Sequence, residues 1–225
     1  MTDSPLTGFV VVDLSTGIPG GYCTKLLADA GADVIKVEAP EGDPLRRWSA
    51  SGSQIGPNED GALFSFLAGG KHSAVADPDL DEDLRWVGDL LAGADAVVWS
   101  PGSPLAEHPA LAPAAMHAAH PHLIVVAITP FGLDGPWSDR PATEFTLQAW
   151  SGGIVGLGRG APDRAPVYVG GRVGDYLSGA YASAAILASR SGWDAARRTV
   201  HRSTSAAGSA TTCPGRMPVR RSWRP

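Results

Sequence analysis

The sequence predicts an α/β protein with a doubly wound, Rossmann-like and mostly parallel sheet flanked by helices. The strongest observation is an almost continuous apolar, β-branched run from Phe9 to Leu14, which is typical of a strand buried on both faces. A glycine-rich turn, a helical pattern and a second apolar strand follow it, with the length expected of a right-handed parallel crossover. Two further apolar runs, Ala94–Trp99 and Leu123–Thr129, each follow a helical pattern, which extends the same alternation.

The individual elements follow from local patterns. After the strand Phe9–Leu14, the turn at residues 15–21 leads into a helix over Tyr22–Ala30, which Gly31 ends, and Ala32–Glu38 forms the second strand. Residues 39–62 form a long loop rich in proline, glycine and serine, and loops of this length tend either to bind something or to be disordered. The later elements expected are an apolar segment at Leu63–Ala68, a helix over Leu80–Leu91, the strand Ala94–Trp99, a short helix over Leu111–Ala119, the strand Leu123–Thr129, a helix over Glu144–Trp150, a strand near Val167–Val169 and a helix that opens at Gly174 and ends near Arg190.

The turn at residues 15–21 invites comparison with a dinucleotide-binding loop. Its three glycines do not have the G-x-G-x-x-G spacing, and Pro19 removes one backbone N–H that could hold a phosphate. Glu38 does end the second strand, as a ribose-binding acid would. Because the glycine spacing is missing, a nicotinamide cofactor is not favoured.

The composition indicates an ordinary soluble globular protein, with 44% hydrophobic and 18% charged residues among 225. No apolar run reaches the roughly 18 to 20 residues of a membrane-spanning helix, and the N-terminus lacks a basic region followed by an apolar one. We therefore expect a cytoplasmic protein with no membrane partner. Cys23 and Cys213 form neither a disulfide framework nor a metal-ligand spacing, and Cys23 is expected to be a core residue; the six histidines show no paired-ligand pattern, so no metal site is expected.

Charge is distributed unevenly along the chain. Residues 1–194 contain 11 basic and 23 acidic residues, a net charge of −12, whereas the last 31 residues carry seven arginines and no acid. The tail has no hydrophobic periodicity, and we expect residues 193–225 to be disordered. The abrupt reversal suggests an altered reading frame or a truncated gene. Arginines scattered among serine, alanine and proline are weak evidence for nucleic-acid binding, and no nucleic-acid partner is expected.

Two acidic residues at predicted helix starts have competing interpretations. Asp175 is either an N-cap, since aspartate accepts a bond from an unpaired backbone N–H, or a carboxylate nucleophile that the positive helix end keeps ionised. Glu144, in the first turn of its helix, is either a complement to the helix dipole or a functional carboxylate. Arg46 and Arg47 in the long loop either meet a phosphate or form a solvated pair. Local sequence does not decide between these interpretations.

Four segments together resemble the family III CoA-transferases, the group that includes formyl-CoA and carnitine CoA-transferases and 2-methylacyl-CoA racemases. They are VVDLSTGIPGGYCTKLLADAGADVIKVEAPEGDPLR, ITPFGLDGPWSDRP, EFTLQAWSGG and PVYVGGRVGDYLSGAYASAAILASR, in matching order from about Phe9 to Arg190. The resemblance implies that residues 1–192 are the N-terminal portion of a doubly wound large domain. It also implies a small domain, missing here, and an interlocked homodimer of the full-length protein.

The resemblance further implies a covalent mechanism. The family's G-D-x-x-x-G aspartate, its nucleophile, matches Asp175, and an assisting glutamate matches Glu144. The carboxylate attacks an acyl-CoA to give a mixed anhydride, CoA returns to give an aspartyl thioester, and an acceptor carboxylic acid takes over the CoA. Acyl-CoA is thus a substrate, and no tightly bound cofactor is expected. Residues at positions implied to contact CoA are Ile18, Arg46, Arg47, Lys71, Ser100 and Gly174.

Departures from the family pattern keep alternatives open. The racemases carry a histidine immediately before the acidic residue of the helix, where this chain has Thr143, so a transferase is the better interpretation. The turns Ala68–Lys71 and Ser100–Ser103 lack arginine and amide groups that help hold CoA in the family, and Lys71 is either a phosphate contact or a solvated surface lysine. Past Arg190 the chain leaves the family pattern. A truncated, non-catalytic remnant that at most binds CoA or a full-length homologue is therefore the alternative function.

Overall fold

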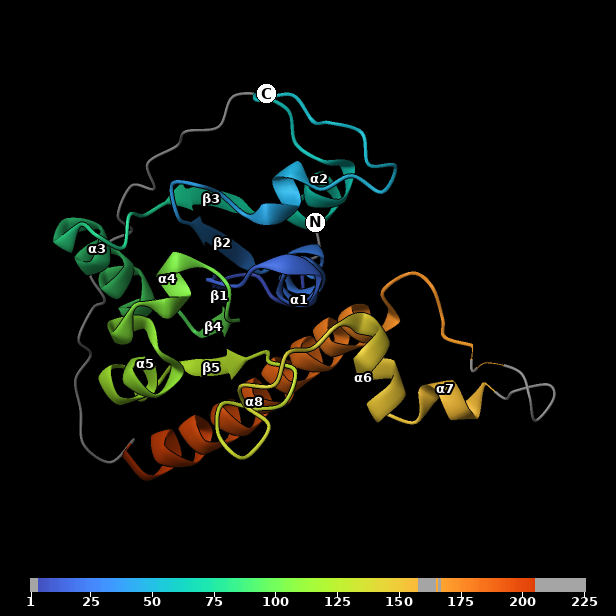
Figure 1. The fold of residues 1–225 in the computed structure, drawn as a ribbon. Helices are drawn as coiled ribbons and strands as arrows, with labels where there is room; N and C mark the ends of the chain where they lie inside the picture. Colours follow the sequence, from blue (N-terminus) through green and yellow to red (C-terminus); the bar gives the residue numbers. More distant parts are fainter. Residues whose placement is uncertain (1–3, 158–164, 166, 205–225) are drawn as a thin grey trace.

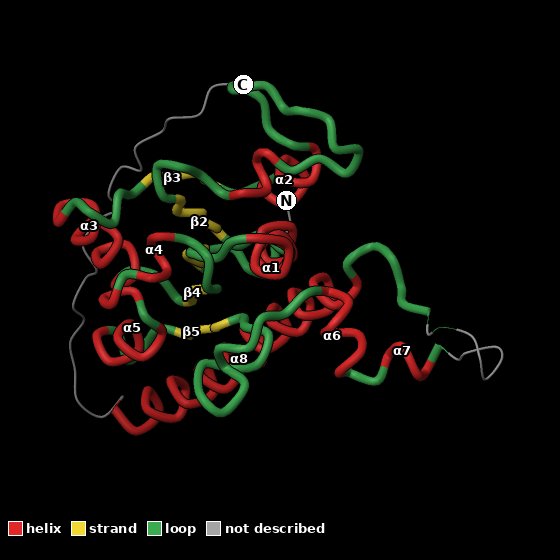
Figure 2. Tube along the Cα trace, in the orientation of Figure 1, coloured by secondary structure: helices red, strands yellow, loops and turns green. Residues whose placement is uncertain are grey.

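The computed structural model describes residues 4–157, 165 and 167–204, and residues 192–204 as backbone only. The described chain is built on a parallel five-stranded sheet with the strand order β3-β2-β1-β4-β5, as Figures 1 and 2 show. This order reverses direction between β1 and β4, as in doubly wound sheets, and confirms the predicted fold class. The strands are β1 Val10–Asp13, β2 Asp33–Glu38, β3 His72–Val75, β4 Ala96–Trp99 and β5 Ile124–Ala127.

Helices cover both faces of the sheet and divide the core into two clusters. Because successive strand residues point to opposite faces, Val11 packs with α1 and α8, whereas Val12 packs on the side of α3, α4 and α5. Cys23 is fully buried in the first cluster, as expected for a core residue, and burial raises the pKa of its thiol to about 12. The helices are α1 Gly17–Asp29, α2 Ala62–Ala68, α3 Asp81–Ala92, α4 Pro104–Glu107, α5 Pro113–Ala119, α6 Glu144–Trp150, α7 Gly153–Gly156 and α8 Val173–Thr204, with 3-10 turns at Pro44–Arg47 and Pro109–Leu111.

Several elements differ from the sequence-based expectation. Helix α1 begins at Gly17, five residues before Tyr22. Gly17 has a left-handed φ of 77°, which glycine adopts without strain and which turns the chain into the helix, and Pro19 is well tolerated in a first helical turn. The short strand β3 was not predicted, since only one of its four residues is buried. Helix α8 continues past Arg190 to Thr204. The disorder expected of residues 193–225 stays a prediction, since residues 205–225 lie outside the described residues and only a helical backbone is described for residues 193–204.

The strand expected at Val167–Val169 does not form. This segment is well exposed, and it lies beside α6 rather than in the sheet. Both backbone groups of Val169 bond to the side chain of Gln148, which takes the place of a neighbouring strand. The β-branched residues correctly predicted an extended backbone, but a strand also needs a neighbouring strand with which to form hydrogen bonds.

The carboxyl ends of β1 and β4 meet at the point where the strand order reverses. There the backbone N–H of Thr16 donates to Ser100 Oγ over 2.9 Å, which joins the β1–α1 turn to the end of β4. The N-terminal half of α8 packs along α1, and α6 contacts α8 near the start of that helix. No helix in the part of the chain that the structure describes is long and apolar enough to cross a membrane.

Candidate active site

Asp175 lies in the first turn of α8, as its third residue and not as its N-cap. The backbone N–H groups of Gly174 and Asp175 donate to Glu144 of α6, over 2.7 Å to Oε1 and 3.3 Å to Oε2. A carboxylate from another helix therefore satisfies the N–H groups that a helix start leaves without partners. The N-cap interpretation of Asp175 is wrong, and its own carboxylate is not used for capping.

The Glu144 carboxylate is oriented by Gln148, one turn later in α6. Gln148 donates its amide N–H to Glu144 Oε1 over 2.7 Å, and the same side chain holds the extended segment at Val169. Burial opposes ionisation of Glu144, but the bonds from the Gly174 N–H and the Gln148 amide outweigh it, so the pKa of Glu144 lies below its ordinary value. A β-carbon at Gly174 would lie 2.9 Å from Glu144 Oε2, so glycine makes this approach possible.

The Asp175 carboxylate is paired with Arg172, the residue that precedes α8. Arg172 Nε lies 2.5 Å from Asp175 Oδ2, and the arginine side chain is 51% exposed, against 13% for the aspartate. Gly171 and Arg172 both have left-handed backbone, with φ of 95° and 61°. Sequence reasoning singled out neither Arg172 nor Gln148, because local sequence does not reveal the partners of a long polar side chain.

The first turn of α8 is held against the first turns of α1. Tyr176 packs edge-on against Tyr22 at a ring-centroid distance of 5.0 Å. A β-carbon at Gly179 would lie 2.5 Å from the carbonyl oxygen of Pro19, so the two helices approach each other closely at this glycine. The start of α8 therefore sits beside the β1–α1 turn, at the carboxyl edge of the sheet where ligands bind in doubly wound folds.

A buried ionic network lies behind the β1–α1 turn. Asp13 is fully buried and accepts bonds from Ser15 Oγ over 2.5 Å, Thr24 Oγ1 over 2.6 Å and Lys71 Nζ over 3.2 Å. Burial alone would raise the pKa of Asp13, but the charges of Lys36 and Lys71 and these hydroxyl bonds lower it to about 2. These buried bonds hold the β1–α1 turn in place.

Lys71 is part of this network and is not a surface residue. Its ammonium also donates to the Gly21 carbonyl over 3.0 Å, and its side chain is 2% exposed, so the interpretation as a solvated lysine is wrong. Burial lowers the pKa of Lys71, whereas the pKa of Lys36 is raised, because Asp13 and Asp43 outweigh the effect of burial there. Phosphate binding by Lys71 stays a prediction.

The two arginines of the long loop bond to residues near both ends of that loop. Arg46 donates to Glu38 over 2.7 and 2.8 Å and to Asp60 over 2.8 and 2.9 Å. Arg47 donates to three backbone carbonyls between residues 56 and 59. Neither arginine is therefore an isolated solvated side chain. A CoA phosphate would have to share the two guanidinium groups with these partners, and the role of Arg46 and Arg47 in CoA binding stays a prediction.

The other residues expected to contact CoA lie at the β1–α1 turn. Ser100 is buried and bonded to Thr16, and Ile18 is buried in the first turn of α1. The structure thus groups Ser100 and Ile18 at one edge of the sheet and Glu144, Gly174 and Asp175 at the start of α8 beside it. Among the described residues, no group of three or more potential ligands is placed to hold a metal ion.

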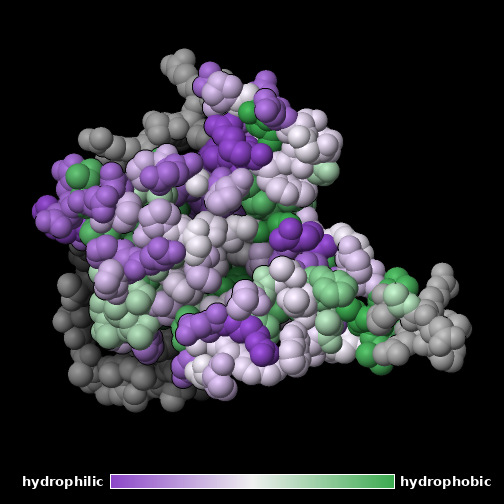
Figure 3. Space-filling model, in the orientation of Figure 1, coloured by the Kyte–Doolittle hydropathy of each residue, from purple (hydrophilic) through white to green (hydrophobic). Residues whose placement is uncertain are grey.

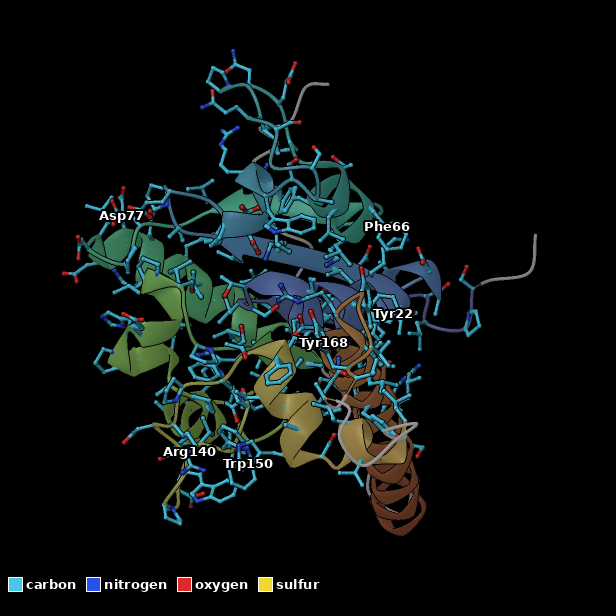
Figure 4. All side chains as sticks on the ribbon, turned by 45° about the vertical axis from the view of Figure 1, so that its right-hand side comes forward. Tyr22, Phe66, Asp77, Arg140, Trp150 and Tyr168 are labelled. Carbon is cyan, nitrogen blue, oxygen red and sulfur yellow. The ribbon has the colours of Figure 1, made fainter. Side chains whose placement is uncertain are left out.

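The loop that follows β5 is held against the end of α6. Trp137 and Trp150 pack with their rings tilted by 60° at a centroid distance of 4.7 Å. The Arg140 guanidinium lies 4.6 Å and 5.2 Å from their ring centroids, and Figure 4 shows Arg140 beside Trp150. An apolar pocket of about 590 Å³ lies between this loop, α6 and α8. It is lined by residues that include Thr129, Leu147, Gly174, Leu177 and Tyr181.

Comparison with known proteins places the chain in a family. Residues 6–195 match the family described as CoA-transferase family III, to which the chain belongs. A succinate–glutarate CoA-transferase from Agrobacterium fabrum is 36% identical over 82% of this chain and 46% of its own length. A succinyl-CoA–D-citramalate CoA-transferase from Chloroflexus aurantiacus is 33% identical over 81% of this chain and 44% of its own length.

Comparison with solved structures gives the same result. The crystal structure of a CAIB/BAIF family protein from Brucella suis superposes with a TM-score of 0.74 at 33% identity, over 88% of this chain and 51% of that one. The chain therefore spans about half the length of the relatives it matches. These relatives confirm the family that the four sequence segments predicted.

Proposed function

We propose that this chain carries the nucleophile of a CoA-transferase, with the Asp175 carboxylate attacking the thioester of an acyl-CoA. The observation that carries this proposal is the arrangement at the start of α8, where Glu144 satisfies the backbone N–H groups and leaves the Asp175 carboxylate outside the capping role. Membership of the family and the CoA-transferase names of the relatives support it.

The proposed steps follow from the chemistry of a carboxylate nucleophile. Attack by Asp175 forms a C–O bond to the acyl carbon and expels CoA thiolate, which leaves a mixed anhydride. The thiolate then attacks the Asp175 carbonyl carbon, releases the acyl group as a free carboxylate and leaves CoA on Asp175 as a thioester. An acceptor carboxylate runs the two steps in reverse and leaves as the new acyl-CoA. Glu144 keeps the first turn of α8 in place throughout, and water must be excluded because it would hydrolyse either intermediate.

The racemase alternative is not supported by the contacts of Thr143. Its Oγ1 accepts a bond from the Thr146 N–H and caps α6, so it offers no acid or base beside Glu144. The interlocked homodimer and the cytoplasmic location stay predictions. Exposed large side chains on and beside α7 include Trp150, Val155 and Leu157. Figure 3 shows hydrophobic surface, in green, in this part of the molecule. Such a surface is consistent with a further protein surface covering this region.

The test is to trap a covalent adduct. Incubating the chain with succinyl-CoA and measuring its intact mass should give a CoA adduct, which peptide mapping assigns to Asp175. Asp175→Ala should form none, and Asp29→Ala, a matched change on the exposed face of α1, should form as much as the wild type. If the wild type binds CoA but gives no adduct with any acyl-CoA tried, the non-catalytic alternative replaces the proposal.

A further inference from the structure

Arg172 occupies an unusual position at the candidate site. Among the described residues it is the one non-glycine residue with left-handed backbone, at a φ of 61°. Its backbone carbonyl accepts the N–H of Tyr176 over 3.1 Å, and its guanidinium reaches forward to the Asp175 carboxylate. Non-glycine residues rarely adopt this conformation, and where they do the surrounding structure holds them there. The turn therefore sets a cation beside Asp175.

This ion pair can be exchanged for another. The Arg172 side chain is 51% exposed, and exposed ion pairs contribute little net stability, so an incoming anion can replace Asp175 at low cost. A guanidinium stays charged at any physiological pH. The Glu144 oxygens already accept bonds from Gly174, Gln148 and the Asp175 N–H. When the Asp175 carboxylate becomes a neutral anhydride or thioester, Arg172 loses the anion to which it is bonded and keeps only the more distant charge of Glu144 nearby.

We propose that Arg172 binds the carboxylate of the acid that leaves and of the acid that accepts CoA, pairing with Asp175 only while Asp175 is a free carboxylate. This inference rests on the proposed function. In the accepting step, a substrate carboxylate oxygen forms a C–O bond to the Asp175 carbonyl carbon, and the C–S bond breaks with its electron pair on the thiolate. The thiolate then attacks the substrate acyl carbon and the anhydride C–O bond breaks, which regenerates the Asp175 carboxylate for Arg172. No net proton transfer is needed.

The position of Arg172 favours a carboxylate over a phosphate of CoA. The reacting carboxylate has to approach the Asp175 carbonyl carbon itself, three residues from Arg172. The phosphates of CoA lie at the far end of its pantetheine arm from the reacting sulfur. A planar guanidinium also matches a carboxylate with two parallel hydrogen bonds. Arg172 is thus a substrate-binding residue rather than a general contact for the cofactor.

The first experiment measures binding and needs no turnover. In Asp175→Asn the neutral side chain imitates the acylated state, and succinate should bind at least tenfold more tightly than to the wild type. Adding Arg172→Gln should remove this gain, and Arg172→Lys should retain part of it. Arg85→Gln, an exposed arginine on α3, makes the same charge change on the opposite face of the sheet and should keep the gain. Equal succinate affinity with and without Arg172→Gln would overturn the proposal, as would an effect confined to CoA binding.

The second experiment separates this inference from the proposed function. If the wild type forms the adduct, Arg172→Gln should raise the KM for the acceptor acid by tenfold or more, by a larger factor than it lowers kcat, and Arg172→Lys should restore part of the loss. A purely structural role would instead lower the yield of folded protein or kcat without changing the acceptor KM. If the wild type forms no adduct, the proposed function is wrong. The succinate titration still tests whether Arg172 binds a carboxylate.

Discussion

The molecule contains two ion-pair groups of opposite character. Asp13 and its lysine partners are enclosed at the end of β1, where Asp13 is fully buried. Arg172 and Asp175, at the start of α8, form one ion pair in which the arginine is half exposed. Burial makes the first group a fixed part of the fold, because a buried charge cannot exchange its partner for water. Exposure of Arg172 leaves the second group able to change partners, as the proposed role of Asp175 requires.

The largest expected effect comes from breaking the buried group. Asp13→Asn removes the charge that faces Lys36 and Lys71 and should lower the free energy of unfolding by about 3 to 5 kcal/mol. Urea denaturation followed by circular dichroism measures it. Asp29→Asn, which breaks the exposed pair with Lys25, is the matched control and should cost less than about 1 kcal/mol. A loss of under about 1 kcal/mol in Asp13→Asn would mean that the network is not structural.

The pH dependence of stability should report the same group. The pKa of Asp13 is about 2 in the folded protein against 3.8 ordinarily, so the unfolded chain takes up the proton first as the pH falls. Its contribution of about 2 kcal/mol is complete above a pH of about 4 and is lost as the pH falls towards about 2. Urea unfolding at a series of pH values should show this loss in the wild type but not in Asp13→Asn. Equal slopes in both proteins would contradict the assignment.

The smallest effect is expected at the exposed pair. Asp175→Asn should change the free energy of unfolding by less than about 1 kcal/mol, because Glu144 and not Asp175 caps α8. The same urea measurement checks it beside Asp13→Asn. If the two variants lose similar stability, Asp175 supports the fold and the contrast between the groups disappears.

Much of the fold could be predicted from local sequence. The bounds of α6 agree with prediction at both ends, and the four apolar strands are found within two residues of their expected ends. Asp175 was correctly expected at the start of a helix, and Cys23 in the core. The short strand β3 was missed and a strand at Val167–Val169 was wrongly predicted, since both depend on which sheet edge or side chain lies alongside. The start of α1 and the end of α8 were also misplaced.

The sequence by itself determined most of the elements, the parallel sheet and the family, because hydrophobic periodicity and turn residues are local properties of the chain. Tertiary structure alone decided the roles of the charged residues. Glu144 reaches α8 from another helix, and Lys71, just before β3, meets Asp13 across the intervening strand β2, so neither contact has a local signature. The physical reason is that the role of a charge depends on its burial and its partners, and both are set only when distant segments pack together.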